Sequence, residues 1–125
     1  MIIFRPAYDS YEPAITLNGG KTISVQLEAP NFSVDWNNVR QKINNRTKMI
    51  IINTPHNPSG TVFSKEDMLQ LEILTKDSNI IVLSDEVYEH MIYDGEEHQS
   101  ACLFPDLKSK SFITGSFGKT FHNTG

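Results

Sequence analysis

The sequence predicts an α/β fold in which a mostly parallel sheet is flanked by helices. Strand-like and helix-like segments alternate along the 125 residues, and this alternation is typical of parallel strands joined by right-handed crossovers. Two segments, 48–53 and 79–83, are apolar through most of their length, as expected of strands that are covered on both faces. The carboxyl ends of such strands meet along one edge of the sheet, where ligands usually bind.

The first third of the chain predicts two strands and two helices. Residues 1–4 predict a short buried strand, and residues 11–17 predict a helix that a glycine pair ends. Residues 22–27 alternate apolar and polar side chains, which predicts a strand with one buried face. Asp35 can then accept backbone hydrogen bonds at the start of a helix over 36–43.

Beyond the apolar segment 48–53, the pattern continues with a helix and two more strands. Ser64 and Asp67 have the spacing of a capping box, which predicts that a helix begins after Ser64. The apolar segment 79–83 and the segment 110–114 follow as strands. Residues 94–109 are polar and irregular in pattern, so they predict a surface connection.

The bulk composition is that of a soluble globular protein. Hydrophobic residues make up 38% of the chain, charged residues make up 21%, and the formal net charge of −4 argues against nucleic-acid binding. No apolar run reaches the roughly 18 residues of a membrane span. Cys102 is the only cysteine, which excludes an internal disulfide and fits a reducing compartment such as the cytoplasm. The chain stops soon after Lys119 rather than in a linker, so we expect a piece of a longer protein.

Three polar motifs follow predicted strands, at residues 53–60, 84–88 and 114–120. They are expected to open on the same edge of the sheet. Together they supply an amine, a carboxylate, a phenol, an amide and a hydroxyl, from Lys119, Asp85, Tyr88, Asn57 and Ser116. This set suits the ring of pyridoxal phosphate, which needs a covalent amine, a partner for its ring nitrogen, donors to its 3′-oxygen and a phosphate anchor.

Other interpretations of these residues are weaker. Taken one at a time, Lys119 can be a surface lysine and Asp85 can be an acid that caps a helix. Tyr88 can be a tyrosine packed in the core, and Asn57 can be an ordinary turn residue. Residues 118–120 resemble the end of a phosphate-binding loop, but Ile113 stands where that motif needs glycine. Ser116 and Lys119 have the spacing of a serine acylase motif without its companion motifs. The four histidines have no metal-ligand spacing with one another or with Cys102, so no metal site is predicted.

With its three motifs in this order, the chain resembles the central part of class I, fold-type I aminotransferases that depend on pyridoxal phosphate. The segment 4–11 fits this resemblance as well. The residues around Tyr8 and Lys119 are similar to those of the kynurenine, glutamine and methionine aminotransferase branch. The resemblance covers essentially all residues. It implies a three-layer αβα fold, with residues 1–125 as an incomplete part of the large cofactor-binding domain of a homodimer.

The resemblance also implies a role for each candidate residue. Lys119 would form the Schiff base with pyridoxal 5′-phosphate and act as the catalytic proton carrier. Asp85 would pair with the pyridine nitrogen, and Tyr88 and Asn57 would hydrogen-bond the 3′-oxygen. Ser116 would touch the phosphate. Tyr8 would stack on the ring face.

The implied activity is transfer of an amino group from an apolar, aromatic or sulfur-containing α-amino acid to a 2-oxo acid. Two alternatives stay open, another fold-type I enzyme such as a carbon–sulfur β-lyase and a non-catalytic truncated fragment. The family's glycine-rich phosphate cradle, its basic phosphate ligand and its carboxylate-binding arginine have no counterpart in the chain. The isolated 125 residues are therefore expected to be inactive, with the amino-terminal and carboxyl-terminal portions of the parent enzyme absent.

Overall fold

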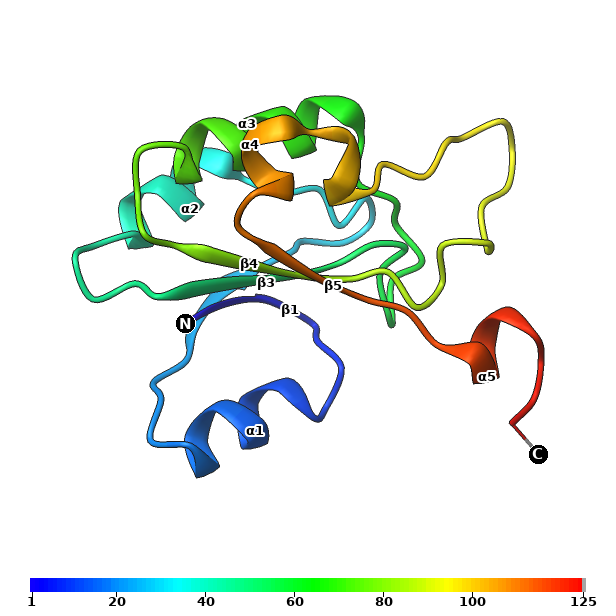
Figure 1. Cartoon of the computed structure of the whole chain (residues 1–125), viewed down its shortest axis with the longest axis horizontal. Coiled ribbons are helices and arrows are strands. Elements are labelled where there is room, and N and C mark those ends of the chain that lie inside the picture. The colour runs from blue at the N-terminus through cyan, green and yellow to red at the C-terminus, as the bar shows by residue number, and fades with distance from the viewer. Residues whose placement is uncertain (125) are drawn as a thin grey trace.

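A single parallel sheet forms the centre of the protein, as the computed structural model of residues 1–124 shows (Figure 1). Its five strands run in the order β2-β1-β3-β4-β5, and every neighbouring pair is parallel. The strands are β1 (Ile2–Arg5), β2 (Ile23–Gln26), β3 (Met49–Asn53), β4 (Ile81–Asp85) and β5 (Ser111–Thr114). This arrangement confirms the predicted α/β fold.

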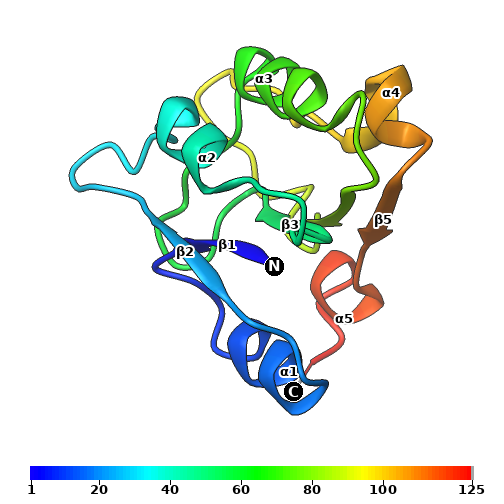
Figure 2. The ribbon, with the colours of Figure 1, turned by 90° about the vertical axis from the view of Figure 1, so that its left-hand side faces the viewer.

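Helices lie on both sides of the sheet. Figure 2 shows α2, α3 and α4 beside one face, with α1 and α5 on the opposite side. The helices are α1 (Tyr11–Leu17), α2 (Trp36–Lys42), α3 (Lys65–Thr75), α4 (Pro105–Lys108) and α5 (Phe117–Thr120), with a 3₁₀ turn at Ala101–Leu103. Within residues 1–124, none of these helices has the length and apolar character needed to cross a bilayer.

The predicted helix starts are confirmed by their hydrogen bonds. The Asp35 side chain accepts from the backbone nitrogens of Asn37 and Asn38, at 3.0 and 3.1 Å. At α3 the Ser64 hydroxyl accepts from the Asp67 nitrogen, while the Asp67 carboxylate accepts from the Ser64 nitrogen. Both caps satisfy donors that a helix start leaves without a partner.

The core lies mainly between the sheet and the α2–α3 layer. Alternate side chains of the central strands point into this layer, and a smaller cluster forms beneath α1 on the opposite face. The larger cluster includes Ile50, Ile52, Val82, Val39, Met68 and Leu71. The smaller cluster is built on Ile3, Ile15 and Ile51. Burial on both faces explains why the central strands are continuously apolar.

Two predictions about the second half of the chain were wrong. Residues 94–109 do not form only a surface connection, because Ala101, Phe104 and Leu107 are buried in the core. Their spacing of three places them on one side of the 3₁₀ turn and α4. The strand predicted over 79–83 is β4, which begins and ends two residues later. It continues to Asp85 because that residue pairs with both neighbouring strands.

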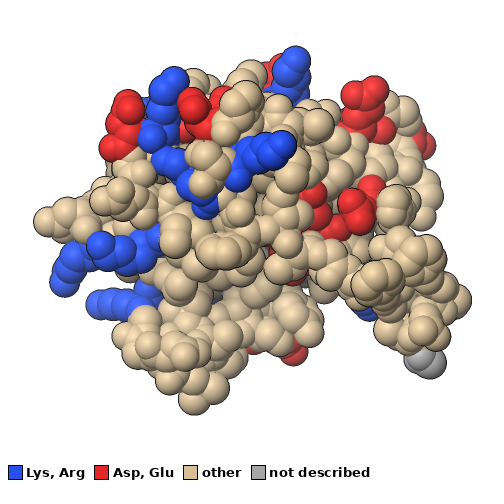
Figure 3. Space-filling model, viewed as in Figure 1, with Lys and Arg blue, Asp and Glu red and all other residues tan. Residues whose placement is uncertain are grey.

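The carboxyl ends of four strands lie at one edge of the sheet. Tyr8 follows β1, Asn53 ends β3, Asp85 ends β4 and Ser116 follows β5. In the view of Figure 3, Lys and Arg side chains gather toward the opposite end of the molecule, while the region over α5 is mostly uncharged. The sheet therefore brings polar residues from distant parts of the sequence to one edge.

Candidate functional site

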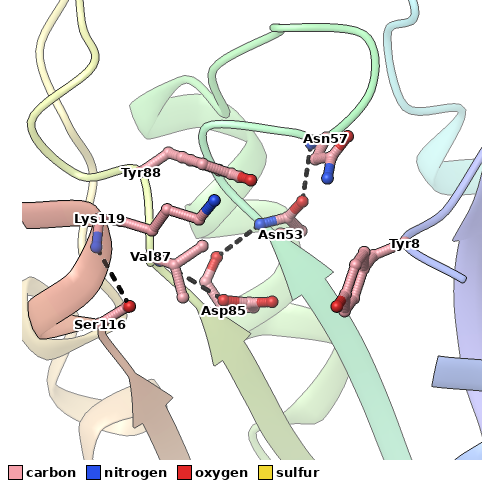
Figure 4. A pocket seen from close by; sticks show the side chains of 8 residues that line it. All are labelled: Tyr8, Asn53, Asn57, Asp85, Val87, Tyr88, Ser116 and Lys119. Carbon is pink, nitrogen blue, oxygen red and sulfur yellow. Dashed lines mark hydrogen bonds between the residues drawn. The ribbon is translucent and has the colours of Figure 1, made fainter. Parts of the chain in front are cut away.

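A pocket of about 170 Å³ opens at this edge of the sheet (Figure 4). It is lined by Tyr8, Asn53, Asn57, Asp85, Val87, Tyr88, Ser116 and Lys119. The structure thus brings together all six residues that the sequence singled out. Asn53 and Val87 were missed, although each lies inside or beside a motif that had been recognised.

Asp85 is held in place through both of its carboxylate oxygens. Oδ1 accepts from the Thr114 hydroxyl at 3.2 Å and from the backbone nitrogen of Val87 at 3.4 Å. Oδ2 accepts from the hydroxyl of Tyr11. Burial raises the pKa of Tyr11 most, and the hydrogen bond to Asp85 and the charge of that carboxylate raise it further. The hydroxyl of Tyr11 therefore stays protonated and donates.

Tyr11 and Thr114 are site residues that the sequence reasoning missed. Thr114 is the last residue of β5 and pairs directly with Asp85 across the ladder, a register that no local pattern reveals. Tyr11 offered a weak signal, because it lies three residues after Tyr8 at the start of a predicted helix. The two tyrosine rings meet edge to face, with their centres 5.7 Å apart.

Asn53 ties the loop after β3 to the end of β4. Its side-chain nitrogen donates to the Asp85 carbonyl at 2.9 Å, and its oxygen accepts from the Asn57 nitrogen at 2.7 Å. In the same loop, His56 is buried and its Nδ1 lies 2.6 Å from the Ser59 hydroxyl. Burial lowers the pKa of His56, against a smaller opposing effect of a hydrogen bond with the backbone of Pro6. These contacts hold Asn57 over the pocket.

Lys119 reaches the pocket from the short helix α5. The Ser116 hydroxyl caps this helix by accepting from the Lys119 backbone nitrogen at 3.3 Å. The Lys119 Nζ lies 5.6 Å from the centre of the Tyr88 ring, within the range of a cation–π contact. Figure 4 shows Lys119 and Tyr8 on opposite sides of the pocket, with Asp85 below the Tyr88 hydroxyl and Asn57.

The segment after Asp85 is a turn. It is anchored by Glu86, which is 2% exposed and points away from the pocket into the protein. Glu86 Oε1 accepts from the Ser84 hydroxyl and the Ala101 nitrogen, at 2.7 and 3.0 Å. Its Oε2 lies 2.8 Å from Nε2 of His98. This network joins β4 to the far end of the loop that carries Tyr88.

Glu86, Glu89 and His98 also form a group of three potential metal ligands whose ligand atoms lie within 4.8 Å of one another. Spacings among the histidines and Cys102 do not reveal this group, because two of its members are glutamates. Both oxygens of Glu86 are already bound by protein groups, so the contacts fit a structural clamp. That the protein binds no metal stays a prediction.

Replacing His98 with alanine is expected to lower the free energy of unfolding by about 2–3 kcal/mol, because the buried Glu86 carboxylate loses a charge-assisted partner. His90 is the matched control, because it lies 3.7 Å from Glu89 in the same loop but is largely exposed. His90→Ala should cost less than ~1 kcal/mol. Urea unfolding of the two variants measures both values, and equal costs would contradict the clamp.

Together, these elements define an α/β protein with a parallel sheet and a lysine-bearing pocket at its carboxyl edge. The family model described as aminotransferase class I and II matches residues 1–125. The chain belongs to that family.

Several named proteins are similar to the chain over its whole length. The methionine aminotransferase of Escherichia coli is 43% identical over 125 residues, and an aspartate aminotransferase of Sulfolobus acidocaldarius is 41% identical over 128. The human kynurenine–oxoglutarate transaminase 1 is 35% identical over 136 residues. In each case all of this chain is covered but only 32% of the relative. The chain thus spans about a third of the length of the curated relatives it matches.

Solved structures share the fold. An Escherichia coli protein whose structure and reactivity identified a methionine aminotransferase function superposes with a TM-score of 0.94 at 43% identity. The match covers 97% of this chain and 32% of that one. Cystalysin from Treponema denticola, whose crystal structure contains a pyridoxal 5′-phosphate cofactor, superposes with a TM-score of 0.89 at 25% identity. That match covers 96% of this chain and 32% of the cystalysin chain.

Proposed function

We propose that residues 1–125 are part of the large domain of a longer aminotransferase that depends on pyridoxal 5′-phosphate. The observation that carries this proposal is the pocket at the carboxyl edge, where Lys119, Asp85 and Asn57 come together from three separate motifs. Membership of the aminotransferase family supports it. Portions on both sides of this segment would complete the enzyme.

The groups in the pocket suit the cofactor. A protonated pyridine nitrogen needs an anion, and the fixed carboxylate of Asp85 provides one. A 3′-oxygen needs donors, and within residues 1–124 no internal hydrogen bond uses the Tyr88 hydroxyl or the Asn57 side-chain amide. The Lys119 amine likewise forms no ion pair or hydrogen bond in this part of the chain, so it is available to react.

Each residue would have a distinct task. Bound in the pocket, the cofactor would supply an electron sink for the pair left when a proton leaves the substrate α-carbon. Asp85 would hold the proton on the ring nitrogen, and Tyr88 and Asn57 would orient the ring through its 3′-oxygen. Ser116 would donate to the phosphate, and Tyr8 would cover one ring face. Lys119 Nζ would attach the cofactor and then move the proton from the α-carbon.

The substrates, the assembly and the location are also proposals. We favour an apolar, aromatic or sulfur-containing amino donor and a 2-oxo acid acceptor, which the named methionine and kynurenine relatives support. An aspartate aminotransferase is almost as similar, so the donor needs a direct assay. Phe117 and Phe121 of α5 are 83% and 68% exposed, which supports a homodimer that would cover them. The single cysteine fits the cytoplasm.

The pocket of this chain is incomplete as a catalytic site. Its volume of about 170 Å³ is below the roughly 300 Å³ at which small-molecule pockets usually begin. Ser116 is the only lining residue that we assign to the phosphate dianion, and a single hydroxyl lacks the Arg or Lys contacts that hold a phosphate strongly. We therefore propose that residues 1–125 alone do not catalyse transamination and bind the cofactor weakly at most.

Covalent attachment at Lys119 is the decisive test of this function. The full-length protein, incubated with pyridoxal phosphate and reduced with borohydride, should carry the label on the peptide that contains Lys119, because the imine becomes a stable amine. Mass spectrometry of the digested protein locates the label. Label on Lys108 or Lys110 instead would overturn the assignment. Release of pyruvate and ammonia from cystathionine without a 2-oxo acid would point to a β-lyase.

A further inference from the structure

Tyr11 contacts the site from behind rather than from within the pocket. It begins α1, 74 residues before Asp85 in the sequence, and its hydroxyl donates to Asp85 Oδ2. Tyr11 is not among the residues that line the pocket. Its ring supports Tyr8, whereas its hydroxyl reaches the pocket through Asp85, and the proposed roles of the lining residues do not account for that hydroxyl.

We propose that Tyr11 is a positioning residue for Asp85. Its hydroxyl holds the carboxylate turned toward the pocket, and so sets how strongly a cationic ring nitrogen is held there. This inference rests on the proposed function, because it assumes that the group paired with Asp85 is the nitrogen of a bound pyridine ring.

The geometry around Asp85 leaves this task to Tyr11. The two other donors, the Thr114 hydroxyl and the Val87 nitrogen, both bind Oδ1, and at 3.2 and 3.4 Å they are long. Within residues 1–124, the hydroxyl of Tyr11 is the single donor to Oδ2. Without it, Oδ2 would lose its partner and the carboxyl group could rotate about the bond that joins it to the Cβ atom.

The chemistry of the phenol suits a permanent donor. Burial and the Asp85 carboxylate raise the pKa of Tyr11, so the group stays neutral at physiological pH and brings no negative charge near the site. A donor to a carboxylate stabilises its ionised form. The proton shared between Asp85 and a ring nitrogen then stays on the nitrogen, and loss of the donor shifts it toward the carboxylate.

The test compares Tyr11→Phe with Tyr93→Phe in the full-length enzyme. Phenylalanine keeps the packed ring and removes only the hydroxyl, while Tyr93 is 70% exposed and serves as the matched control. Tyr11→Phe is expected to lower kcat roughly tenfold with KM for the amino acid changed less than about twofold. It should also shift the pH midpoint at which the absorbance band of the bound cofactor changes. Tyr93→Phe should change neither kcat nor this pH midpoint.

A double-mutant cycle shows whether the effect passes through Asp85. In an Asp85→Asn background, Tyr11→Phe should have little further effect on kcat or on the spectrum, because the anion it serves is gone. A readout without cofactor is the carbon-13 spectrum of labelled tyrosines. The Tyr11 resonance should resist titration at alkaline pH, and Asp85→Asn should lower its pKa because the neighbouring charge is removed.

The outcomes separate this inference from the function on which it rests. Suppose that the unmodified protein is labelled at Lys119, so that the proposed function holds. If the Tyr11→Phe enzyme then has the same spectrum and kcat as the Tyr93→Phe enzyme, the role of Tyr11 is overturned. Additive effects of Tyr11→Phe and Asp85→Asn would also overturn it, since Tyr11 would then act independently of Asp85. Failure to label Lys119 in the unmodified protein would overturn the proposed function and this inference together.

Discussion

Replacing Asp85 with asparagine is expected to lower turnover about 10³-fold while the cofactor remains attached through Lys119. The carboxylate supplies the only anion in the part of the pocket that residues 1–124 form, and a protonated ring nitrogen makes the cofactor a much better electron sink. Asparagine keeps the shape of the side chain but removes the charge. Steady-state kcat, with attachment followed by absorbance, measures the two expectations separately.

Asp106→Asn is the control for this experiment. Asp106 pairs with Lys76 at 3.1 Å near the start of α4, and the side chain of Asp106 is 45% exposed. Its replacement should leave kcat unchanged. Near-normal turnover of Asp85→Asn would mean that Asp85 only organises the ends of β4 and β5 and that the ring nitrogen has another partner.

Replacing Lys119 with alanine is expected to lower turnover by roughly 10⁴-fold or more, because both the covalent anchor and the proton carrier are lost. Lys119→Arg should be equally inactive, since a guanidinium keeps the positive charge but is neither a nucleophile nor a base at neutral pH. Amino transfer from methionine to a 2-oxo acid, measured at saturating cofactor, checks both variants.

The arginine variant distinguishes two roles for this lysine. If Lys119→Arg kept substantial activity, the residue would act only as a positive charge near the cofactor. Lys108→Ala is the matched control, because Lys108 lies in the last turn of α4, outside the pocket. Its replacement should leave turnover unchanged, so equal losses in both variants would indicate a general defect in folding.

Most of the fold could be predicted because its signals are local. The central strands are continuous apolar runs, and Asp35 and Ser64 cap helices through atoms two or three residues away. Residues 101–108 were misjudged because the burial of Phe104 and Leu107 depends on packing against the core beneath α3, which no periodicity within so short a segment reveals.

The residues of the candidate site could be predicted to a similar extent. Strand-end motifs located five of the six candidate residues, because the ends of parallel strands meet at one edge, and the family resemblance supplied the role of Tyr8. The support behind Asp85 was not predictable, since Tyr11 reaches it across 74 residues and Thr114 reaches it through strand register. Glu86 was passed over for a related reason. It adjoins Asp85 in the sequence, but alternation along the chain turns its side chain to the opposite face.

The order of the chain sets the order in which the site residues are synthesised. Asn57, which follows β3, and Asp85, which ends β4, leave the ribosome before β5 does. Within residues 1–124, the last strand, β5, pairs only with β4 and is followed directly by α5, which carries Lys119. Among the residues that line the pocket, Lys119 is therefore the last to be synthesised, after Tyr8, Asn57 and Asp85.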